Sequence, residues 1–298
     1  MSLRAREARA GWLFLSPTLV TVLVMVVLPV LWTLMLAFQD VRLINIRQVG
    51  LFGNYTLENL SRVLSSPNFA EALRTTLIFT VAGTTLSILL GLAAALCVRR
   101  PFRGRTFVRA AMLLPYVAPV VAVTFVWEVM LHPQFGVVNE IGTSLLGWER
   151  AIPFLSQEGV ALATVIAFEA WRYFPFAFLF LLARLQAIPG DLDEAARVDG
   201  ATPLQRFRHI TFPQLTSVIA LLAVLRFIWT FNEFDDIYLL TGGGAGTEVV
   251  SVRVFQLLTA RADVGEAAAQ AMVLAVALVV LLGIYFAFFA RRFEETPS

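Results

Sequence analysis

Residues Ile188–Pro213 have the sequence IPGDLDEAARVDGATPLQRFRHITFP. This segment is polar and charged, yet strongly apolar segments precede and follow it along the chain. A polar insert of this regularity between apolar segments indicates a docking element for a soluble partner. The alternative is an ordinary solvated loop, because short amphipathic helices are common in loops.

The sequence as a whole has the composition of a membrane protein. Of its 298 residues, 58% are hydrophobic and 15% are charged, and the mean hydropathy is +0.77. Soluble domains contain about 45–50% apolar and about 25% charged residues. Most of the surface is therefore expected to face lipid or other apolar helices. Since no linker or internal repeat interrupts the chain, we predict a single membrane domain over residues 1–298.

Six segments are long and apolar enough to cross a bilayer, which takes about 20 residues. Two prolines in the first segment are compatible with a membrane helix, because neighbouring groups satisfy the freed carbonyls. The fourth segment contains Glu169 and Arg172, and the fifth contains Arg226. The predicted fold class is therefore all-α and integral to the membrane, with six transmembrane helices. The predicted spans are residues 13–38, 75–98, 107–130, 160–183, 214–234 and 267–290.

The distribution of arginine orients these spans, because short cytoplasmic loops carry an excess of basic residues. With the N-terminus inside, arginines in the cytoplasmic segments outnumber those in the outside loops by two to one. Both termini and the polar loop 188–213 are therefore predicted to be cytoplasmic. A signal peptide is the alternative for the first segment. It is disfavoured because the apolar run is too long and no cleavage site follows it.

Local chemistry predicts two short helices in the polar loop. Asp191, followed three residues later by Glu194, resembles a capping box and predicts a helix over Leu192–Val198. Asp199 and Gly200 then predict the end of this helix, with Gly200 in the left-handed conformation.

Thr202 and Pro203 predict the cap and the first residue of a second helix that runs to His209. Pro213 is expected to begin the next span. Apolar and basic side chains occupy opposite sides of this second helix, which suits insertion into a groove on another protein. They are Leu204 and Phe207 on one side, and Arg206 and Arg208 on the other.

Several kinds of chemistry lack the residues they require. No Lys occurs in the chain, and because a Walker A loop needs one, ATP hydrolysis is expected in a partner chain. Cys97 is the single cysteine, so neither an internal disulfide nor a thiolate metal cluster can form. The sequence contains no nucleophile elbow, no H-E-x-x-H motif and no long basic patch. We therefore expect no enzyme activity, no bound metal or cofactor and no nucleic-acid partner.

The polar loop resembles the EAA loop of the permease subunits of bacterial ABC importers, whose pattern is I-P-x-x-x-x-E-A-A-x-x-D-G-A followed by I-x-x-P. The matching residues are Ile188, Pro189, Glu194, Ala195, Ala196, Asp199, Gly200, Ala201, Ile210 and Pro213. The resemblance implies a cytoplasmic coupling helix that sits in a cleft of an ATPase subunit. Glu194 would meet a basic residue of that subunit, and Gly200 would permit the bend. The residues expected at this contact are Glu194, Ala195, Ala196, Asp199, Gly200, Leu204, Phe207 and Arg208.

Other motifs extend the resemblance over nearly the whole chain and indicate the carbohydrate type, a group that includes maltose-type and glycerol-3-phosphate-type permeases. The segment WLFLSP at residues 12–17 resembles the first span of this group. The segment FDDIYLLTGGG at residues 234–244 resembles a signature loop. The chain departs from the group at Ala245, where a proline usually follows the glycines.

A solute pathway is expected to use polar and aromatic side chains. Charged residues within membrane helices are costly and usually face a cavity or a partner, and aromatic rings stack on sugars. The candidates are Trp127, Glu128, Glu169, Arg172, Tyr173, Arg226, Trp229, Asn232 and Asp235. Glu169 and Arg172 are three residues apart on one helix face, where they are able to pair. The alternatives are structural ion pairs for the charges and the interfacial belt for the aromatic residues.

The resemblance also implies an assembly in the bacterial inner membrane. A second, related permease chain, two cytoplasmic ATPase subunits that use ATP and Mg, and an extracytoplasmic solute-binding protein would complete the importer. The expected solute is a sugar or sugar-like molecule, with a polyol, glycerol-3-phosphate or a glycerophosphodiester as the alternative. An ion-driven secondary transporter is a more remote alternative, and the lack of visible inverted repeats disfavours it.

Overall fold

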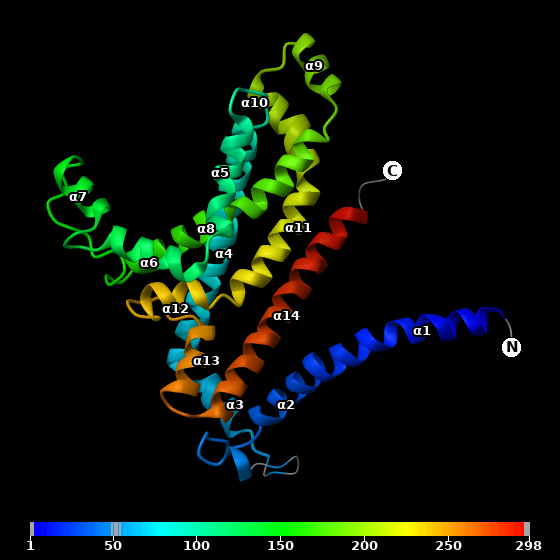
Figure 1. Cartoon of the computed structure of the whole chain (residues 1–298), viewed down its shortest axis with the longest axis vertical. Coiled ribbons are helices and arrows are strands. Elements are labelled where there is room, and N and C mark those ends of the chain that lie inside the picture. Colours follow the sequence, from blue (N-terminus) through cyan, green and yellow to red (C-terminus); the bar gives the residue numbers. More distant parts are fainter. Residues whose placement is uncertain (1–2, 49, 51–52, 54, 295–298) are drawn as a thin grey trace. The chain divides into compact units, whose positions relative to one another are not determined.

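The computed structural model (Figure 1) describes residues 3–48, 50, 53 and 55–294, and the side chains of 11–47, 50, 53 and 55–287. The described residues form helices, with two isolated β-bridges and no β-strand. The α-helices are α1 (Leu3–Val22), α2 (Leu28–Ala37), α3 (Glu58–Ser65), α4 (Pro67–Cys97), α5 (Arg105–Val117), α6 (Val120–Leu131), α7 (Val137–Ser144), α8 (Val160–Gln186), α9 (Gly190–Val198), α10 (Pro203–Arg206), α11 (Phe212–Phe231), α12 (Asp235–Thr241), α13 (Val250–Thr259) and α14 (Val264–Glu294). Two π-helical turns, η1 (Leu23–Val27) and η3 (Phe207–Thr211), and one 3-10 turn, η2 (Ile46–Gln48), complete the set.

Among the described residues, five helices are long and apolar enough to cross a membrane, or six if one bent pair counts as a single span. The all-α membrane class predicted from the sequence is thus confirmed. The five spans are Gly11–Ala37, Pro67–Cys97, Val160–Gln186, Pro203–Phe231 and Val264–Ala287.

The bent pair corresponds to the predicted third span, residues 107–130. Here α5 and α6 meet at an angle of 96° instead of forming one helix. Ala118, at the break, has extended backbone angles (φ −66°, ψ 140°). It precedes Pro119, whose ring disfavours the helical conformation of the residue before it. The proline therefore explains the bend.

Pro17 and Pro175 lie inside regular α-helix, whereas a π-helical turn precedes each of two further prolines within continuous spans. Turn η1 ends two residues before Pro29, and η3 ends two residues before Pro213. In these wide turns the amides of Leu28 and Phe212 reach carbonyls five residues back. We interpret the wide turns as room for the proline rings, which clash with the carbonyl four residues back in a regular α-helix. Pro213 therefore does not begin a new helix, as the sequence suggested, but continues a rod that starts at Pro203.

The structure has two compact units, which we describe separately. The first unit comprises Met1–Ala70 and Val254–Leu281. Its centre is the buried side chain of Asn59, whose Nδ2 donates hydrogen bonds to the carbonyls of Ala37 (3.2 Å) and Gln39 (2.8 Å) at the end of α2. The amides of Val264 and Gly265 both donate to the Val41 carbonyl at 2.9 Å. These bonds satisfy backbone groups that a helix end would otherwise leave unpaired.

The second unit comprises Glu71–Arg253 and Leu282–Ser298. In it α4, α8 and α11 share a buried core, and α12 packs against α6 and α8. A close approach of α4 to α8 occurs at Gly91, where a Cβ atom would lie 2.7 Å from Ala177 Cβ and 2.8 Å from the Phe178 nitrogen. The main core residues are Ile88, Ala95, Phe178, Leu181, Leu185, Leu215 and Leu222.

We predict that Gly91→Ala lowers the melting temperature of the purified protein, because the added methyl overpacks the contact between α4 and α8. Overpacking of this kind costs about 1–3 kcal/mol. Gly283→Ala is the matched control, since a Cβ atom there meets nothing within 4 Å and alanine favours a helix over glycine. Equal melting temperatures for the two variants would contradict the close approach.

Candidate functional site

A buried ion pair joins α8 to α11 inside the second unit. The Arg226 Nη2 atom contacts the Glu169 Oε1 atom directly, and their side chains are 1% and 0% exposed. Thr230, one turn after Arg226, donates from its hydroxyl to the same carboxylate oxygen at 2.8 Å. The hydroxyl also accepts from the Arg226 guanidinium at 3.0 Å. Buried charges are tolerated when they are paired and hydrogen-bonded in this way.

A second ion pair joins α8 to α12. Arg172 Nη1 contacts Asp236 Oδ1, and the Asp236 side chain is fully buried. Asp236 lies on the same inward face of α12 as Ile237 and Leu240. Arg172 and Glu169 thus share a helix face, but each has an ion-pair partner on a different helix. The pairing between these two residues that their spacing suggested is not what the structure shows.

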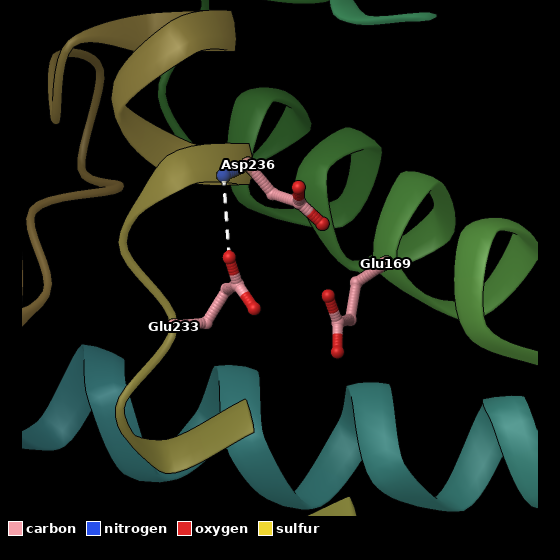
Figure 2. A group of neighbouring side chains, drawn as sticks. All are labelled: Glu169, Glu233 and Asp236. Atoms are coloured by element: carbon pink, nitrogen blue, oxygen red, sulfur yellow. Dashed lines mark hydrogen bonds between the residues drawn. The ribbon is translucent and has the colours of Figure 1, made fainter. Parts of the chain in front are cut away.

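Glu233 brings a third carboxylate to the cluster from the segment between α11 and α12 (Figure 2). It accepts long hydrogen bonds, both 3.4 Å, from the Tyr173 hydroxyl and the Asp236 amide. One oxygen of each carboxylate lies within 4.8 Å of the other two. This spacing would suit a metal ion, but two guanidinium groups already contact Glu169 and Asp236. We therefore interpret the cluster as an ion-pair network with one carboxylate in excess.

One aromatic ring contacts both guanidinium groups. The Tyr173 ring lies 4.1 Å from the Arg226 guanidinium carbon and 5.0 Å from that of Arg172, so it makes cation–π contacts with both. Tyr116 packs edge-on against Tyr173, with ring centroids 6.0 Å apart. The tyrosine therefore stabilises both ion pairs and presents its hydroxyl to Glu233.

The predicted pathway residues fall into three groups by exposure. Glu169 and Arg226 are buried in their ion pair, so any effect they have on a solute acts through neighbouring side chains. Trp127, Arg172 and Tyr173 are half-buried, and Trp127 packs edge-on against Phe168. The exposed members are Glu128, Trp229, Asn232 and Asp235.

Three members of the cluster, Glu233, Asp236 and Thr230, are not among the nine candidate residues. Asp236 is 64 residues from its partner Arg172 in the sequence, so no local spacing connects them. One signal was present: Asp236 shares a helical face with Ile237 and Leu240, whereas Asp235 does not. That periodicity marks Asp236 as the inward carboxylate.

The polar loop forms the second candidate site. Helix α9 ends at Val198, and Gly200, two residues later, has φ 77°. The Gly200 amide donates to the Arg197 carbonyl (3.0 Å), and the Ala201 amide donates to the Ala196 carbonyl (2.9 Å). These two bonds form a Schellman motif, so the predicted left-handed stop at Gly200 is confirmed.

The predicted start of α9 is wrong in detail. The helix begins at Gly190 with Pro189 as its N-cap, and no side chain caps it. Asp191 and Asp193 instead lie in the first turn, where negative charge complements the helix dipole. A capping box does form at the next helix, between Thr202 and Gln205.

Asp193 holds the two parts of the loop together. Both of its oxygens accept from Arg206 Nη1, at 2.9 and 2.8 Å, and Arg197 Nη2 lies 3.1 Å away. Charge-assisted contacts of this kind are among the stronger hydrogen bonds. Of the predicted contact residues, Ala196 and Phe207 are half-buried, and the exposed ones are Glu194, Ala195, Asp199, Gly200, Leu204 and Arg208.

The loop after α12 differs from what a proline would allow. Ala245 has φ 51°, in the left-handed region, whereas proline is fixed near φ −65°. The hydroxyls of Thr241 and Thr247 lie 2.6 Å apart across this loop. Ala245 therefore adopts a backbone conformation that is not accessible to proline at this position.

We predict that Arg226→Met strongly destabilises the protein, because it leaves the Glu169 carboxylate buried without a cation. Breaking a buried pair in this way costs about 3–5 kcal/mol. Replacing both partners, as in Arg226→Met with Glu169→Leu, should recover most of the loss in thermal unfolding of the purified protein. Glu128→Gln, at an exposed carboxylate, is the control. A double variant no more stable than the single one would contradict this account.

We predict that Ala245→Pro increases hydrogen exchange over residues 242–249, because the ring cannot adopt φ 51°. Ala245→Gly should leave exchange unchanged or reduce it, since it removes a steric cost of about 1–2 kcal/mol. Equal exchange in the proline and glycine variants would show that this backbone conformation does not hold in solution.

Comparison with known proteins now connects these features to a family. The family model for the binding-protein-dependent transport system inner membrane component matches residues 87–295. The inner membrane ABC transporter permease protein YcjO of Escherichia coli strain K12 is 37% identical over 76% of this chain and 76% of its own. The trehalose/maltose transport system permease protein MalF of Thermococcus litoralis is 37% identical over 84% of this chain and 83% of its own.

Among solved structures, a bacterial alginate ABC transporter in complex with an alginate pentasaccharide-bound periplasmic protein contains a similar chain. That chain superposes with a TM-score of 0.79 and 25% sequence identity, over 98% of this chain and 99% of its own. The similarity thus extends over nearly the whole fold. The chain belongs to the binding-protein-dependent transport system inner membrane components, which are the permease subunits of ABC transporters.

Proposed function

We propose that this permease moves a sugar or sugar-like solute into the cytoplasm, driven by separate ATPase subunits that dock on the loop 188–213. The observation that carries the proposal is the exposed, internally hydrogen-bonded form of this loop, with a Schellman stop at Gly200 and the Asp193–Arg206 contact. The solute class is supported by the trehalose/maltose permease and by the alginate transporter, whose printed names refer to carbohydrates.

The connections of the loop suggest how force reaches the membrane helices. Helix α9 follows α8 after a short turn, and α10 continues through η3 into α11 without a break. Arg184 on α8 donates from Nε to the Gln214 carbonyl at 3.0 Å, close to the loop. The Arg226–Glu169 pair joins the same two helices further along. Movement of the loop would therefore shift α8 and α11 as a connected pair.

The solute would pass beside the cluster rather than through it. Trp229, Asn232 and Asp235 are exposed near the end of α11, and Tyr173 is half-buried in the cluster. Hydroxyl-rich solutes suit such a set, since carboxylate and amide groups accept or donate hydrogen bonds and aromatic rings pack against the sugar ring. The ion pairs would hold α8, α11 and α12 in the geometry that presents these side chains.

The proposed assembly contains a second permease chain, two cytoplasmic ATPases that use ATP and Mg, and an extracytoplasmic solute-binding protein. The periplasmic protein named with the alginate transporter supports the last of these. In this arrangement both termini and the loop 188–213 lie in the cytoplasm, as the arginine distribution favours.

We predict that Gly200→Ala reduces both solute uptake and binding-protein-stimulated ATPase activity of the assembled complex. The substitution places a Cβ atom at φ 77°, which costs about 1–2 kcal/mol and weakens the stop after α9. Gly190→Ala is the matched control, because it lies at the other end of α9, has no positive φ, and a Cβ atom there meets nothing within 4 Å.

Glu194→Ala tests the same surface without touching the backbone. Because Glu194 is exposed, its removal should leave the melting temperature unchanged while lowering stimulated ATPase activity. Uptake that persists in the absence of any ATPase would instead favour an ion-driven transporter. If both the Gly200 and Glu194 variants kept full uptake and full stimulated ATPase activity, the proposed role of the loop in coupling would be wrong.

A further inference from the structure

A cavity of about 720 Å³ lies between the polar loop and the end of α4. Its walls come from the turn after α4, from α9 and from the start of the α10–η3–α11 rod. One candidate membrane span ends at Cys97 and another begins at Pro203, and both residues line the cavity. The cavity therefore adjoins the ends of two helices that are long and apolar enough to cross a membrane.

The lining of this cavity is basic. Four arginines and two carboxylates line it, which gives a formal charge of +2 (four minus two). Asp193 is already engaged by two of the arginines through the contacts described above. The remaining arginines, Arg99 and Arg100, come from the opposite wall. The four arginines are Arg99, Arg100, Arg197 and Arg206.

Two observations concern the hydrogen-bonding capacity of these arginines. The Arg206 Nε atom is buried and has no hydrogen-bond partner in the described part of the chain. Because that atom is shielded from the cavity, an anion there would meet the outer nitrogens of the arginines instead. In addition, Arg105 and Arg109 bind the carbonyls of Val98 and Arg99, the two residues that follow α4. The side chains of Arg99 and Arg100 are not needed for these bonds.

We propose that this cavity binds a phosphate group, carried by an anionic phospholipid of the adjoining leaflet. Guanidinium groups match phosphate oxygens through paired hydrogen bonds. Basic pockets between membrane helices are a recurrent binding mode for anionic headgroups. Leu96, Pro101 and Phe207 supply apolar wall for the glycerol and the start of the acyl chains. Free phosphate would be recognised by the same chemistry, so the experiment must distinguish it from a lipid headgroup.

Cys97 provides the test, because it is exposed, lines the cavity and is the single cysteine of the chain. The full chain is reconstituted in nanodiscs of phosphatidylcholine, with or without phosphatidylglycerol, and the rate of its modification by the uncharged reagent N-ethylmaleimide is measured. We expect phosphatidylglycerol to slow modification roughly fivefold, the effect of ~1 kcal/mol for one arginine near an anionic lipid.

Matched variants separate a site from a general effect of surface charge. Arg100→Gln removes an arginine that lines the cavity, and Arg103→Gln removes one from the same turn that does not line it. Each variant is compared with itself in the two lipid compositions, which cancels any change in intrinsic thiol reactivity. Phosphatidylglycerol should no longer slow the modification of Cys97 in Arg100→Gln, and should still slow it in Arg103→Gln.

A further arm adds inorganic phosphate to phosphatidylcholine nanodiscs, against chloride at the same ionic strength. Protection there that Arg100→Gln abolishes supports the phosphate site and assigns a soluble source. No protection by phosphatidylglycerol or by phosphate, or equal protection in both variants, would overturn the proposal. Since the permease alone is used, this outcome does not depend on the transport assay.

Discussion

The burial of charge in an apolar domain is the constraint on which this structure depends. Arg226 and Glu169 are almost completely buried, and an unpaired charge in such surroundings is too costly to persist. Each therefore fixes the position of the other, and with them the register of α11 against α8. The Arg172–Asp236 pair does the same for α12. The apolar contacts among these helices are less directional, so the ion pairs decide which faces meet.

The same helices connect the membrane interior to the polar loop. A rod that runs from Pro203 to Phe231 has the loop at one end and the cluster at the other. It stays continuous because the π-helical turn η3 gives Pro213 room. With a flexible joint at Pro213, the loop could move without displacing the helix at Arg226. The rod therefore gives the proposed coupling a physical route through one packed element.

Local and long-range features differ in how far the sequence predicts them. The spans follow from apolar length, and the stop at Gly200 follows from Asp-Gly chemistry, because both depend on neighbouring residues. Pro119 was a local signal for the α5–α6 bend. Hydropathy does not detect this bend, because it measures only how apolar the segment is. The partner of Arg172 was not predictable from spacing, since Asp236 is 64 residues away and Glu169 is only three. Tertiary packing selected the distant carboxylate.

The charges at the two ends of α11 have opposite sign, and this bears on orientation. The cavity end is lined by four arginines against two carboxylates. The other end has four carboxylates, Glu169, Glu233, Asp235 and Asp236, against the two arginines Arg172 and Arg226, a formal charge of −2 (two minus four). Arginine near a membrane surface favours the cytoplasmic side, while acidic residues contribute little to topology. Because the basic end is also the end that has the proposed docking loop, charge and the proposed coupling favour the same direction of insertion. An inverted chain would place the docking surface out of reach of ATP and the arginine-rich end on the disfavoured side.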